Sequence, residues 1–417
     1  MQLKCILNRI QKFQSFVYKK VHLAEKNKSL ILLVDIKARA NSWLVCSRCG
    51  KHCKCYDTLS PRWFEFVPLW GIPVFFVYAM RRVNCSMCGI VVETVPWAEG
   101  NQHLTTTYAW FLARWAKRMS WKEVAIAFKT TWDHVFQAVE QAVNWGRCHR
   151  DLSGITAIGV DEVQWHRGHK YLTVVYQIDQ ACKRLLWVGL DRTEKTLEDF
   201  FTAFGRERTK ALKFICSDMW KPYLTIIAKM ADAAMHLLDR YHITAKMNKA
   251  LDEVRASEAK DLKAKGLEPV LKHSRWCLLK RPENLTEKQD TTLAELLKYN
   301  LKSVRAYLLK EEFHFFWEYT SSAWAEKFMD AWCKKVMRSR IDPMMKIAQM
   351  LRTHKPLILN WFKARDAISL GAVEGLNNKE KLVTRKSYGF RTFKAIEIAL
   401  YHTLGALPEL KATHRFC

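Results

Sequence analysis

The chain has 417 residues, of which 49% are hydrophobic and 12% aromatic, so its composition excludes a disordered protein and supplies two or three packed domains. Lys and Arg outnumber Asp and Glu by 68 to 41, which gives a formal net charge of +27 at pH 7. Such an excess indicates a large polyanionic partner. DNA or RNA is favoured over an anionic membrane surface because no amphipathic anchor is evident.

The sequence also bears on location. The most apolar stretch, residues 66–80, is interrupted by Pro68, Gly71 and Pro73, and it is too short to span a bilayer. The chain does not open with the charged, apolar and small-residue pattern of a secretory signal. We therefore expect a cytoplasmic protein that does not associate with membranes.

Residues 1–100 are expected to form an N-terminal region, with no function assigned to 1–42 and a zinc-binding β module at 46–88. A CxxC pair stands at each end of that module, and the expected ligands are Cys46, Cys49, Cys85 and Cys88. Four thiolates at this spacing are typical of a closed, structural Zn²⁺ site with no open position for a reacting water. The gap between the pairs is longer than in compact zinc ribbons, which predicts a long hairpin between them.

Two alternatives to this ligand set stay open. Cys53 and Cys55, together with His52, lie between the two pairs and offer competing ligands. The other interpretation is that the cysteines are reduced structural residues that bind no metal.

Residues 101–150 have apolar residues at helical spacing, broken near Ser120 and Thr130, which predicts short helices with tight connections. The segments 120–125 and 130–135 are similar to a helix-turn-helix whose second helix enters a DNA major groove. The residues expected to contact DNA here are Lys122, Lys129 and His134. A plain helical hairpin is the alternative.

Beyond residue 155 the pattern changes to β-strands. Residues 155–160, 171–178 and 184–190 are expected to form an antiparallel meander. A helix at 194–208, a strand at 211–217, a helix from Pro222, a strand at 236–238 and another helix should follow. This order is typical of a ribonuclease H-like mixed sheet.

The remaining sequence is predicted to be helical. Residues 245–365 have helical periodicity and few strand signals, so we expect an all-helical insertion, with Trp317, Trp324 and Trp332 in its core. The segment from Gly371 is helical and strongly basic.

Two acidic residues follow predicted strands of this sheet. Asp161 comes directly after residues 155–160, and Asp218 directly after 211–217, so their side chains should converge at one edge. Two close carboxylates favour a hard divalent cation between them, and phosphodiester chemistry uses two such ions. A helix beside this edge should supply a third ligand, Glu374. The alternative for each aspartate taken alone is a solvated cap at a strand end. Glu162 is the competitor of Asp161, but side chains alternate along a strand, so Glu162 should face the opposite side.

Short motifs in this region resemble the ISL-three family of insertion-sequence transposases. They are Gly-Val-Asp-Glu at 159–162, Asp-Arg-Tyr-His at 239–242, Glu-Gly-Leu-Asn-Asn-Lys at 374–379 and Lys-Ser-Tyr-Gly-Phe-Arg-Thr-Phe at 386–393. The likeness covers nearly the whole chain beyond about Cys46. It includes the zinc-binding and helix-turn-helix segments in the same order.

The resemblance implies an α/β multidomain DDE transposase. Its ribonuclease H-like core would comprise residues 151–244 and 366–417, interrupted by the helical insertion. Asp161, Asp218 and Glu374 would be catalytic and hold two Mg²⁺ or Mn²⁺ ions. Asp218 follows Asp161 by 57 positions and Glu374 follows Asp218 by 156, and the longer second spacing fits an interrupted core. His242 would assist proton transfer or contact DNA near the site; a histidine that packs beside the sheet is the alternative.

The resemblance also implies the partners and the reaction. The chain would bind transposon terminal inverted repeats, cleave DNA and join it to a target. Because two transposon ends must be held together, a homodimer on DNA is expected. Its expected location is the bacterial cytoplasm, in association with the nucleoid. Further DNA contacts are expected from Asn378, Lys379, Lys381, Arg385, Lys386, Tyr388 and Arg391. Two other functions stay open: a catalytically inactive transposase-derived DNA-binding protein, and a structure-specific nuclease that cuts without joining.

Overall fold

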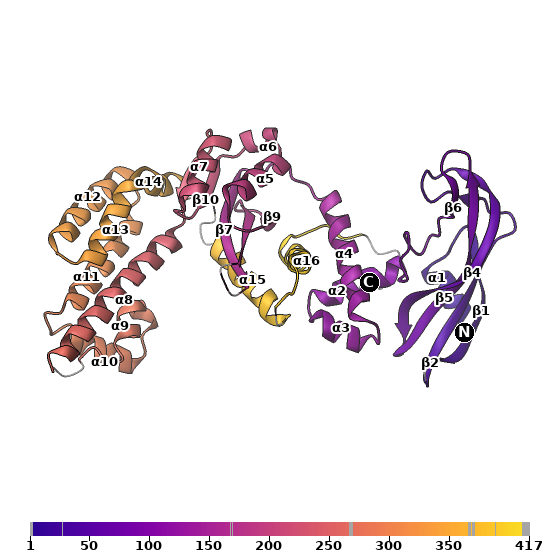
Figure 1. Cartoon of the computed structure of the whole chain (residues 1–417), viewed down its shortest axis with the longest axis horizontal. Coiled ribbons are helices and arrows are strands. Elements are labelled where there is room, and N and C mark those ends of the chain that lie inside the picture. The colour runs from indigo at the N-terminus through magenta and orange to yellow at the C-terminus, as the bar shows by residue number, and fades with distance from the viewer. Residues whose placement is uncertain are drawn as a thin grey trace. The chain divides into compact units, whose positions relative to one another are not determined.

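The computed structural model describes residues 3–26, 28–166, 168, 170–266, 270–365, 368, 372–387 and 389–410. The chain divides into two compact units, one of residues 1–151 with 379–417 and one of residues 152–378 (Figure 1). Among the described residues, no helix combines the length and the hydrophobicity needed to cross a membrane.

The first unit opens with a sheet that is larger than the module predicted from the cysteines. Its elements are α1 (Leu3–Ile10), β1 (Phe16–Lys26), β2 (Ser29–Ala38), β3 (Leu44–Val45), β4 (His52–Leu69), β5 (Ile72–Cys85) and β6 (Gly89–Val92). The strand order is β1-β2-β5-β4-β3, with β6 paired to β5. Residues 16–38, to which the sequence assigned no role, therefore supply two strands. Their core packs around the buried rings of Tyr18, Phe64, Phe76 and Trp97.

Strands β4 and β5 form the long antiparallel hairpin that the cysteine spacing predicts. Leu69 pairs with Ile72, so only Trp70 and Gly71 make the turn. Both have positive φ, 50° and 75°, as in the type I′ turns that match the twist of a hairpin.

Helices α2 (Thr106–Ala116), α3 (Trp121–Ala127) and α4 (Trp132–His149) follow. Thr105, Ser120 and Thr131 cap their N-termini, which explains the predicted breaks near residues 120 and 130. The turn between α3 and α4 contains Lys129 in the left-handed conformation, with φ 52°. In the same unit, α16 (Phe393–Leu404) packs against α4, where Arg147 Nη1 lies 3.1 Å from Glu397 Oε1.

The second unit contains a mixed sheet in the order β11-β10-β7-β8-β9. Its elements are β7 (Ala157–His166), β8 (Lys170–Ile178), β9 (Lys183–Leu190), α5 (Glu194–Phe204), α6 (Arg206–Lys210), β10 (Phe214–Ser217), α7 (Lys221–Met230) and β11 (Met235–Leu238). β7, β8 and β9 form the predicted antiparallel meander, and β10 runs parallel to both β7 and β11.

Two boundaries differ from the prediction. The helix expected at 194–208 breaks at Gly205, whose φ is 93°, and α6 then continues to Lys210, so β10 starts at Phe214. Asp161 was expected after the end of a strand, and this was wrong. β7 continues to His166 because its pairing with β8 extends that far, whereas its described pairing with β10 ends at Gly159.

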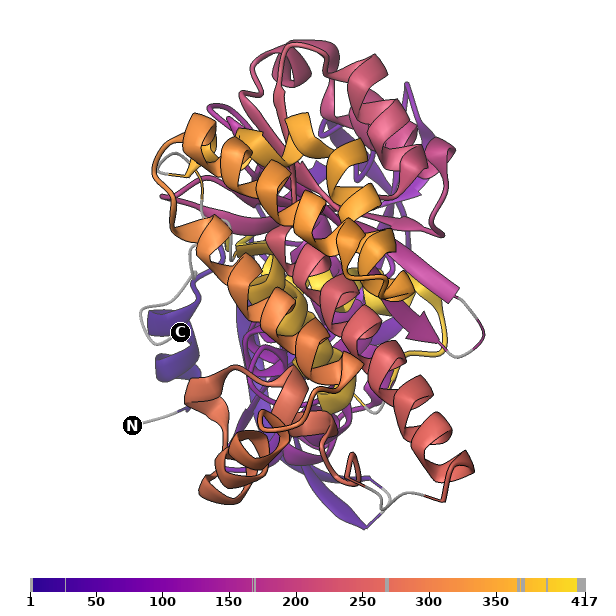
Figure 2. The ribbon, with the colours of Figure 1, turned by 90° about the vertical axis from the view of Figure 1, so that its left-hand side faces the viewer.

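Helices make up the described elements between residues 240 and 364. They are α8 (Arg240–Ala264), α9 (Arg275–Leu279), η1 (Pro282–Asn284), α10 (Glu287–Leu296), α11 (Lys302–His314), η2 (Phe315–Glu318), α12 (Ser322–Arg338), α13 (Asp342–Thr353) and α14 (Lys355–Ala364). The long helix α8 packs alongside α11 and α13 (Figure 2). Trp317 and Trp332 are buried in this bundle as expected, but Trp324 is 60% exposed, so its assignment to the core was wrong.

Helix α15 (Ala372–Lys386) belongs to both units: its residues up to Asn378 group with the second unit, and those from Lys379 group with the first.

Candidate functional site

Three aspartates stand at one level of the mixed sheet. In the parallel registers, Cys216 pairs with Gly159 and Ser217 pairs with Leu238. Extending the first register by two residues places Asp218 opposite Asp161. Extending the second by one residue places Asp218 opposite Asp239. The backbone N–H of Asp239 also donates to the Ser217 carbonyl at 2.8 Å, which continues the β10–β11 ladder to this level. The sheet therefore brings together carboxylates that are distant in the sequence.

The carboxylate of Asp161 is buried, with 5% of the residue exposed, and several elements hold it. Asn377 on α15 donates an amide hydrogen bond to Oδ2, while His242 Nε2 on α8 lies 3.4 Å from Oδ1. The Glu162 backbone N–H donates to Oδ1 at 2.7 Å. The Asn377 carbonyl oxygen accepts a 2.9 Å hydrogen bond from the Tyr176 hydroxyl, which orients its amide group toward Asp161.

His242 lies among acidic groups. Its Nε2 is 3.9 Å from Asp239 Oδ2, and potential ligand atoms of Asp161, Asp239 and His242 all lie within 4.8 Å of one another. Asp239 also caps α8, because its Oδ1 accepts from the Tyr241 N–H at 2.9 Å. Burial lowers the pKa of His242, but Asp161, Asp239 and Asp218 more than offset this and raise the pKa to about 9. A protonated His242 therefore stabilises the neighbouring carboxylates electrostatically.

Asp218 is half-buried beside this cluster. Its Oδ1 accepts from the Trp220 N–H at 2.9 Å. Burial raises the pKa of Asp218, and the negative charge of Asp161 acts in the same direction, while His242 opposes both. Among the described residues, the close group around Asp161 consists of Asp239 and His242, so Asp218 is an electrostatic neighbour of this group and not one of its members.

Glu374 is the third residue of α15, and its side chain is outside the described part of the chain. The backbone of its helix is nevertheless held against β7 (Figure 1). Val373 is buried and packs on Gly159, where an added Cβ would lie 2.5 Å from Val373 Cγ2. Asn377, one helical turn later, reaches Asp161. Residue 374 thus belongs to the helical turn that contacts β7.

Glu162, the competitor of Asp161, has a different partner. It forms an ion pair with Arg192, as expected if alternation along the strand separates the two acids. Burial raises the pKa of Glu162 to about 7, although Arg192 opposes the shift.

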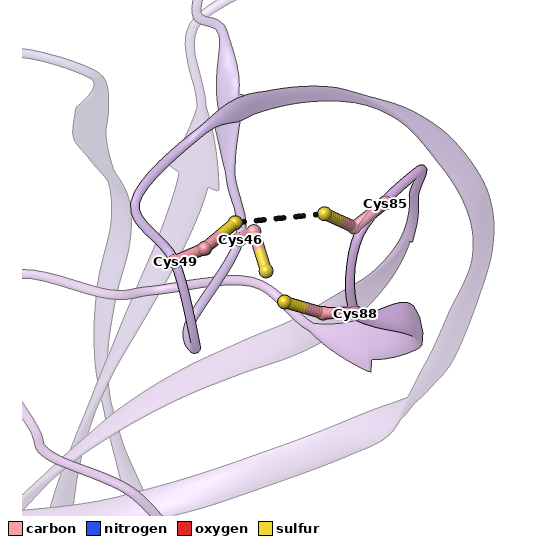
Figure 3. Close-up of side chains that lie close together, drawn as sticks. All are labelled: Cys46, Cys49, Cys85 and Cys88. Atoms are coloured by element: carbon pink, nitrogen blue, oxygen red, sulfur yellow. Dashed lines mark hydrogen bonds between the residues drawn. The ribbon is translucent and has the colours of Figure 1, made fainter.

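A second cluster lies in the first unit, where the side chains of Cys46, Cys49, Cys85 and Cys88 turn toward one another (Figure 3). Their sulfur atoms all lie within 4.8 Å of one another, and Cys49 Sγ is 3.6 Å from Cys85 Sγ. A tetrahedral Zn²⁺ site with Zn–S bonds of about 2.3 Å has sulfur atoms about 3.8 Å apart, so the group fits this ion. The N–H groups of Met87 and Cys88 lower the pKa of Cys85 to about 6, which favours a thiolate.

Neither extra cysteine belongs to the close group of four, although Cys53 packs beside it. Cys53 Sγ donates to the Lys51 carbonyl and Cys55 Sγ to the Asp57 carbonyl, each at 3.5 Å. The cluster therefore comprises the four cysteines of the two CxxC pairs.

The candidate DNA-contacting residues on α3 and α4 have different surroundings. Lys122 is exposed on α3, and Lys129 is exposed in the following turn. His134 is half-buried, with Nδ1 3.2 Å from Glu65 Oε2 and 3.1 Å from Thr130 Oγ1. Its hydrogen bond to Glu65 raises the pKa of His134, although burial opposes this. One ring nitrogen of His134 therefore binds the protein itself.

The C-terminal candidates are mostly exposed. Exposed side chains belong to Asn378, Lys379, Lys381, Arg385 and Arg391. Lys386 is half-buried, and its Nζ donates to the Lys117 carbonyl at 3.4 Å. Tyr388 lies outside the described residues. The neighbouring Phe390 is buried against Trp121, with ring centroids 5.8 Å apart.

Asn377 and Tyr176 were missed at the sequence level. Asn377 lies three residues after Glu374 and therefore on the same side of a helix, a spacing that was available in the sequence. Nothing in the sequence near Tyr176 pointed to the site, because its hydroxyl reaches Asn377 only through the fold.

Comparisons with known proteins agree with the sequence motifs. The family model of ISL3-type DDE transposases, described as a transposase, matches residues 158–400. The transposase for insertion sequence element IS1001 of Bordetella parapertussis is 28% identical over 352 residues, which cover 84% of this chain and 86% of the relative. The transposase for insertion sequence element IS1557 of Mycobacterium tuberculosis is 29% identical over 421 aligned residues, which cover 92% of this chain and 91% of the relative.

Proposed function

We propose that this chain, which belongs to the ISL3 family of DDE transposases, binds the terminal inverted repeats of its own element and catalyses divalent-metal-dependent DNA cleavage and strand transfer. The observation that carries the proposal is the site around Asp161. Here Asp218 and Asp239 follow the parallel strands β10 and β11 at the level of Asp161 within β7, and the helix that contains Glu374 packs on β7. A deep carboxylate site beside a helix is suited to divalent cations.

The order of strands supports a ribonuclease H-like core. The meander of β7, β8 and β9 is the one expected from the sequence, and β10 and β11 are added in parallel beside β7, which makes the sheet mixed. We assign residues 151–244 and 366–417 to this core, of which the residues from Lys379 group with the first compact unit, and residues 245–365 to the helical insertion.

Asp161, Asp218 and Glu374 would hold Mg²⁺ or Mn²⁺. Two such ions would activate the attacking hydroxyl and stabilise the leaving oxygen. Asn377 orients the Asp161 carboxylate, and Tyr176 orients Asn377. His242 is close enough to Asp161 to exchange a proton with a group bound there.

The first unit would recognise the DNA. The cluster of four cysteines would hold Zn²⁺ as a structural ion, since four thiolates complete its coordination. Helices α3 and α4, joined by a short turn, would act as a helix-turn-helix with α4 in a major groove. Exposed Lys122 and the basic residues of α15 would neutralise phosphates, so affinity should fall steeply with salt. Synapsis of two ends would require at least a dimer.

The test is a joining assay with pure protein, Mg²⁺, pre-cleaved duplexes from the two ends of the element that encodes this chain, and a supercoiled target plasmid. Joined products support the proposal. Cleavage of uncut ends without joining would replace it with a nuclease. End binding without either reaction, in Mg²⁺ and in Mn²⁺, would leave a DNA-binding protein that has lost catalysis.

A further inference from the structure

We propose that the β4–β5 hairpin is a second DNA-contacting element, whose tip residue Trp70 enters the minor groove beside the major groove that α4 occupies. This inference rests on the proposed binding of duplex ends by α4, and it adds a contact that the helix-turn-helix does not provide.

Trp70 is 90% exposed, the largest exposed fraction among the described exposed large hydrophobic residues. It also has a φ of 50°, a left-handed conformation that bulky L-residues seldom adopt and that Asn or Gly accepts readily. The indole ring therefore contributes little to the packing of the hairpin and occupies a position that suits another residue better. Strained, exposed aromatic residues of this kind are commonly functional.

The hairpin tip is fixed to the turn between α3 and α4. Lys129 Nζ donates to the Gly71 carbonyl at 3.1 Å, so the residue next to Trp70 contacts the turn directly. Further along β4, Glu65 Oε2 accepts from Thr130 Oγ1 at 2.8 Å and lies 3.2 Å from His134 Nδ1. These contacts connect the hairpin to the N-terminal end of α4, which is the end that reads bases in a helix-turn-helix.

The same end of the sheet is basic. β2 runs parallel to β5, with Leu32 opposite Val74, so the β1–β2 turn lies at the Trp70 end. Lys26 and Lys28 are exposed at this turn, and with Lys129 they outnumber the exposed Glu25. Lys26 Nζ also lies 4.9 Å from the centroid of the Trp63 ring on β4, seven residues before Trp70. An exposed aromatic ring with lysines at the same end of the sheet matches the chemistry of a DNA backbone and groove.

The dimensions of B-DNA fit this placement. A major groove about 12 Å wide admits a helix, and one phosphate backbone separates it from a minor groove about 6 Å wide. With the N-terminus of α4 in the major groove, Lys129 would face that backbone. Trp70 would lie beyond the backbone, where an apolar side chain can pack on sugars or wedge against a base step.

Trp70→Asn tests the contact without disturbing the fold, because it creates Asn-Gly, the preferred sequence for a type I′ turn. Binding would be measured to labelled duplexes from the two ends of the element by mobility shift. Contacts in the minor groove would be measured by hydroxyl-radical footprinting, and contacts in the major groove by protection of guanine N7 from dimethyl sulfate. We expect affinity to fall about tenfold, which is typical of losing one aromatic contact to a base. Minor-groove protection beside the α4 site should disappear, while major-groove protection stays. Trp70→Phe, which keeps a ring, should restore part of both.

Trp276→Ala, which removes another exposed tryptophan in the second unit, is the matched control and should bind like the wild type. If Trp70→Asn binds as tightly as the wild type with the same footprint, the hairpin inference is wrong and the proposed function stands. If the wild type itself does not bind the ends, the proposed function fails as well. A uniform loss of footprint in Trp70→Asn with an unchanged melting temperature would also overturn the minor-groove assignment.

Discussion

Asn377 on α15 donates a hydrogen bond to the buried carboxylate of Asp161 on β7, although 216 residues separate the two in the chain. This contact joins the helix that carries Glu374 to the strand that carries Asp161. The Tyr176 hydroxyl fixes the other end of the Asn377 amide. The candidate site therefore depends on a polar connection between the sheet and a helix, α15, that comes after helices α8 to α14 in the chain.

Asp161→Asn, Asp218→Asn and Glu374→Gln should each reduce cleavage and joining by a factor of about 10³ or more, since each loses a carboxylate that would bind the catalytic ions. End binding should remain within a few-fold of the wild type. Single-turnover cleavage and mobility shift measure the two properties. Strand transfer at wild-type rate in any of these variants would remove that residue from the proposed ligand set.

Asn377→Ala should lower the cleavage rate by roughly 10- to 100-fold, as observed when residues that orient metal ligands are lost. Because Asp161 itself remains, the concentration of Mg²⁺ needed for half-maximal rate should rise. Asn378→Ala is the matched control: its side chain is exposed, so the Mg²⁺ dependence should not change even if DNA binding weakens. An unchanged Mg²⁺ dependence in Asn377→Ala would show that the contact does not position Asp161.

Gly159→Ala should destabilise the second unit by about 1–3 kcal/mol, because overpacking forces neighbouring atoms to move. The new Cβ would lie 2.5 Å from Val373 Cγ2 and displace the start of α15. The cleavage rate should fall by more than the loss of folded protein explains, since residue 374 is on the same helical turn as Val373. Val373→Ala added to Gly159→Ala should recover much of both losses in thermal denaturation and cleavage assays. A double variant no better than Gly159→Ala would contradict the packing argument.

The charge of His242 should make the metal-free protein sensitive to alkaline pH. The neighbouring carboxylates raise the pKa of His242 to about 9 in the folded chain, against about 6.5 when unfolded. Its protonation therefore stabilises the fold fully below about pH 6.5, by up to about 3 kcal/mol, and this contribution is lost as pH rises toward 9. Thermal denaturation of the wild type and His242→Gln from pH 6 to 9.5, without metal, should show a stability difference that shrinks over this range. A constant difference would contradict protonation of His242 in the folded protein.

Pure protein should contain one Zn²⁺ per chain, and Cys46→Ser should lose it. Without the ion the β3–β6 region should unfold locally, since binding free energy and folding are coupled at such sites. End binding should therefore weaken in Cys46→Ser and after chelation, as measured by metal analysis and mobility shift. Cys148→Ser removes an exposed cysteine outside the cluster and should retain both zinc and binding. Wild-type protein prepared without chelators and free of zinc would refute this assignment.

Local patterns in the sequence were sufficient for much of this organisation. Periodicity and caps located α2, α3 and α4, and β-rich runs located the β7–β9 meander, because these elements depend on neighbouring residues. The CxxC pairs and the motifs at 159–162 and 374–379 are likewise local, so they pointed to the cysteine cluster and to Asp161 and Glu374 as candidates.

Only the tertiary structure decided which of these groups meet. The contacts of Asp161 with Asn377 and His242 arise from the packing of α15 and α8 against β7 and from parallel strand register, which no short segment encodes. The role of residues 16–38 as strands of the first sheet, and the contact of the β4–β5 turn with the turn between α3 and α4, likewise follow from pairings between distant segments. Such contacts depend on how the surfaces of whole helices and sheets pack against one another. The residues that meet are therefore known only from the folded chain.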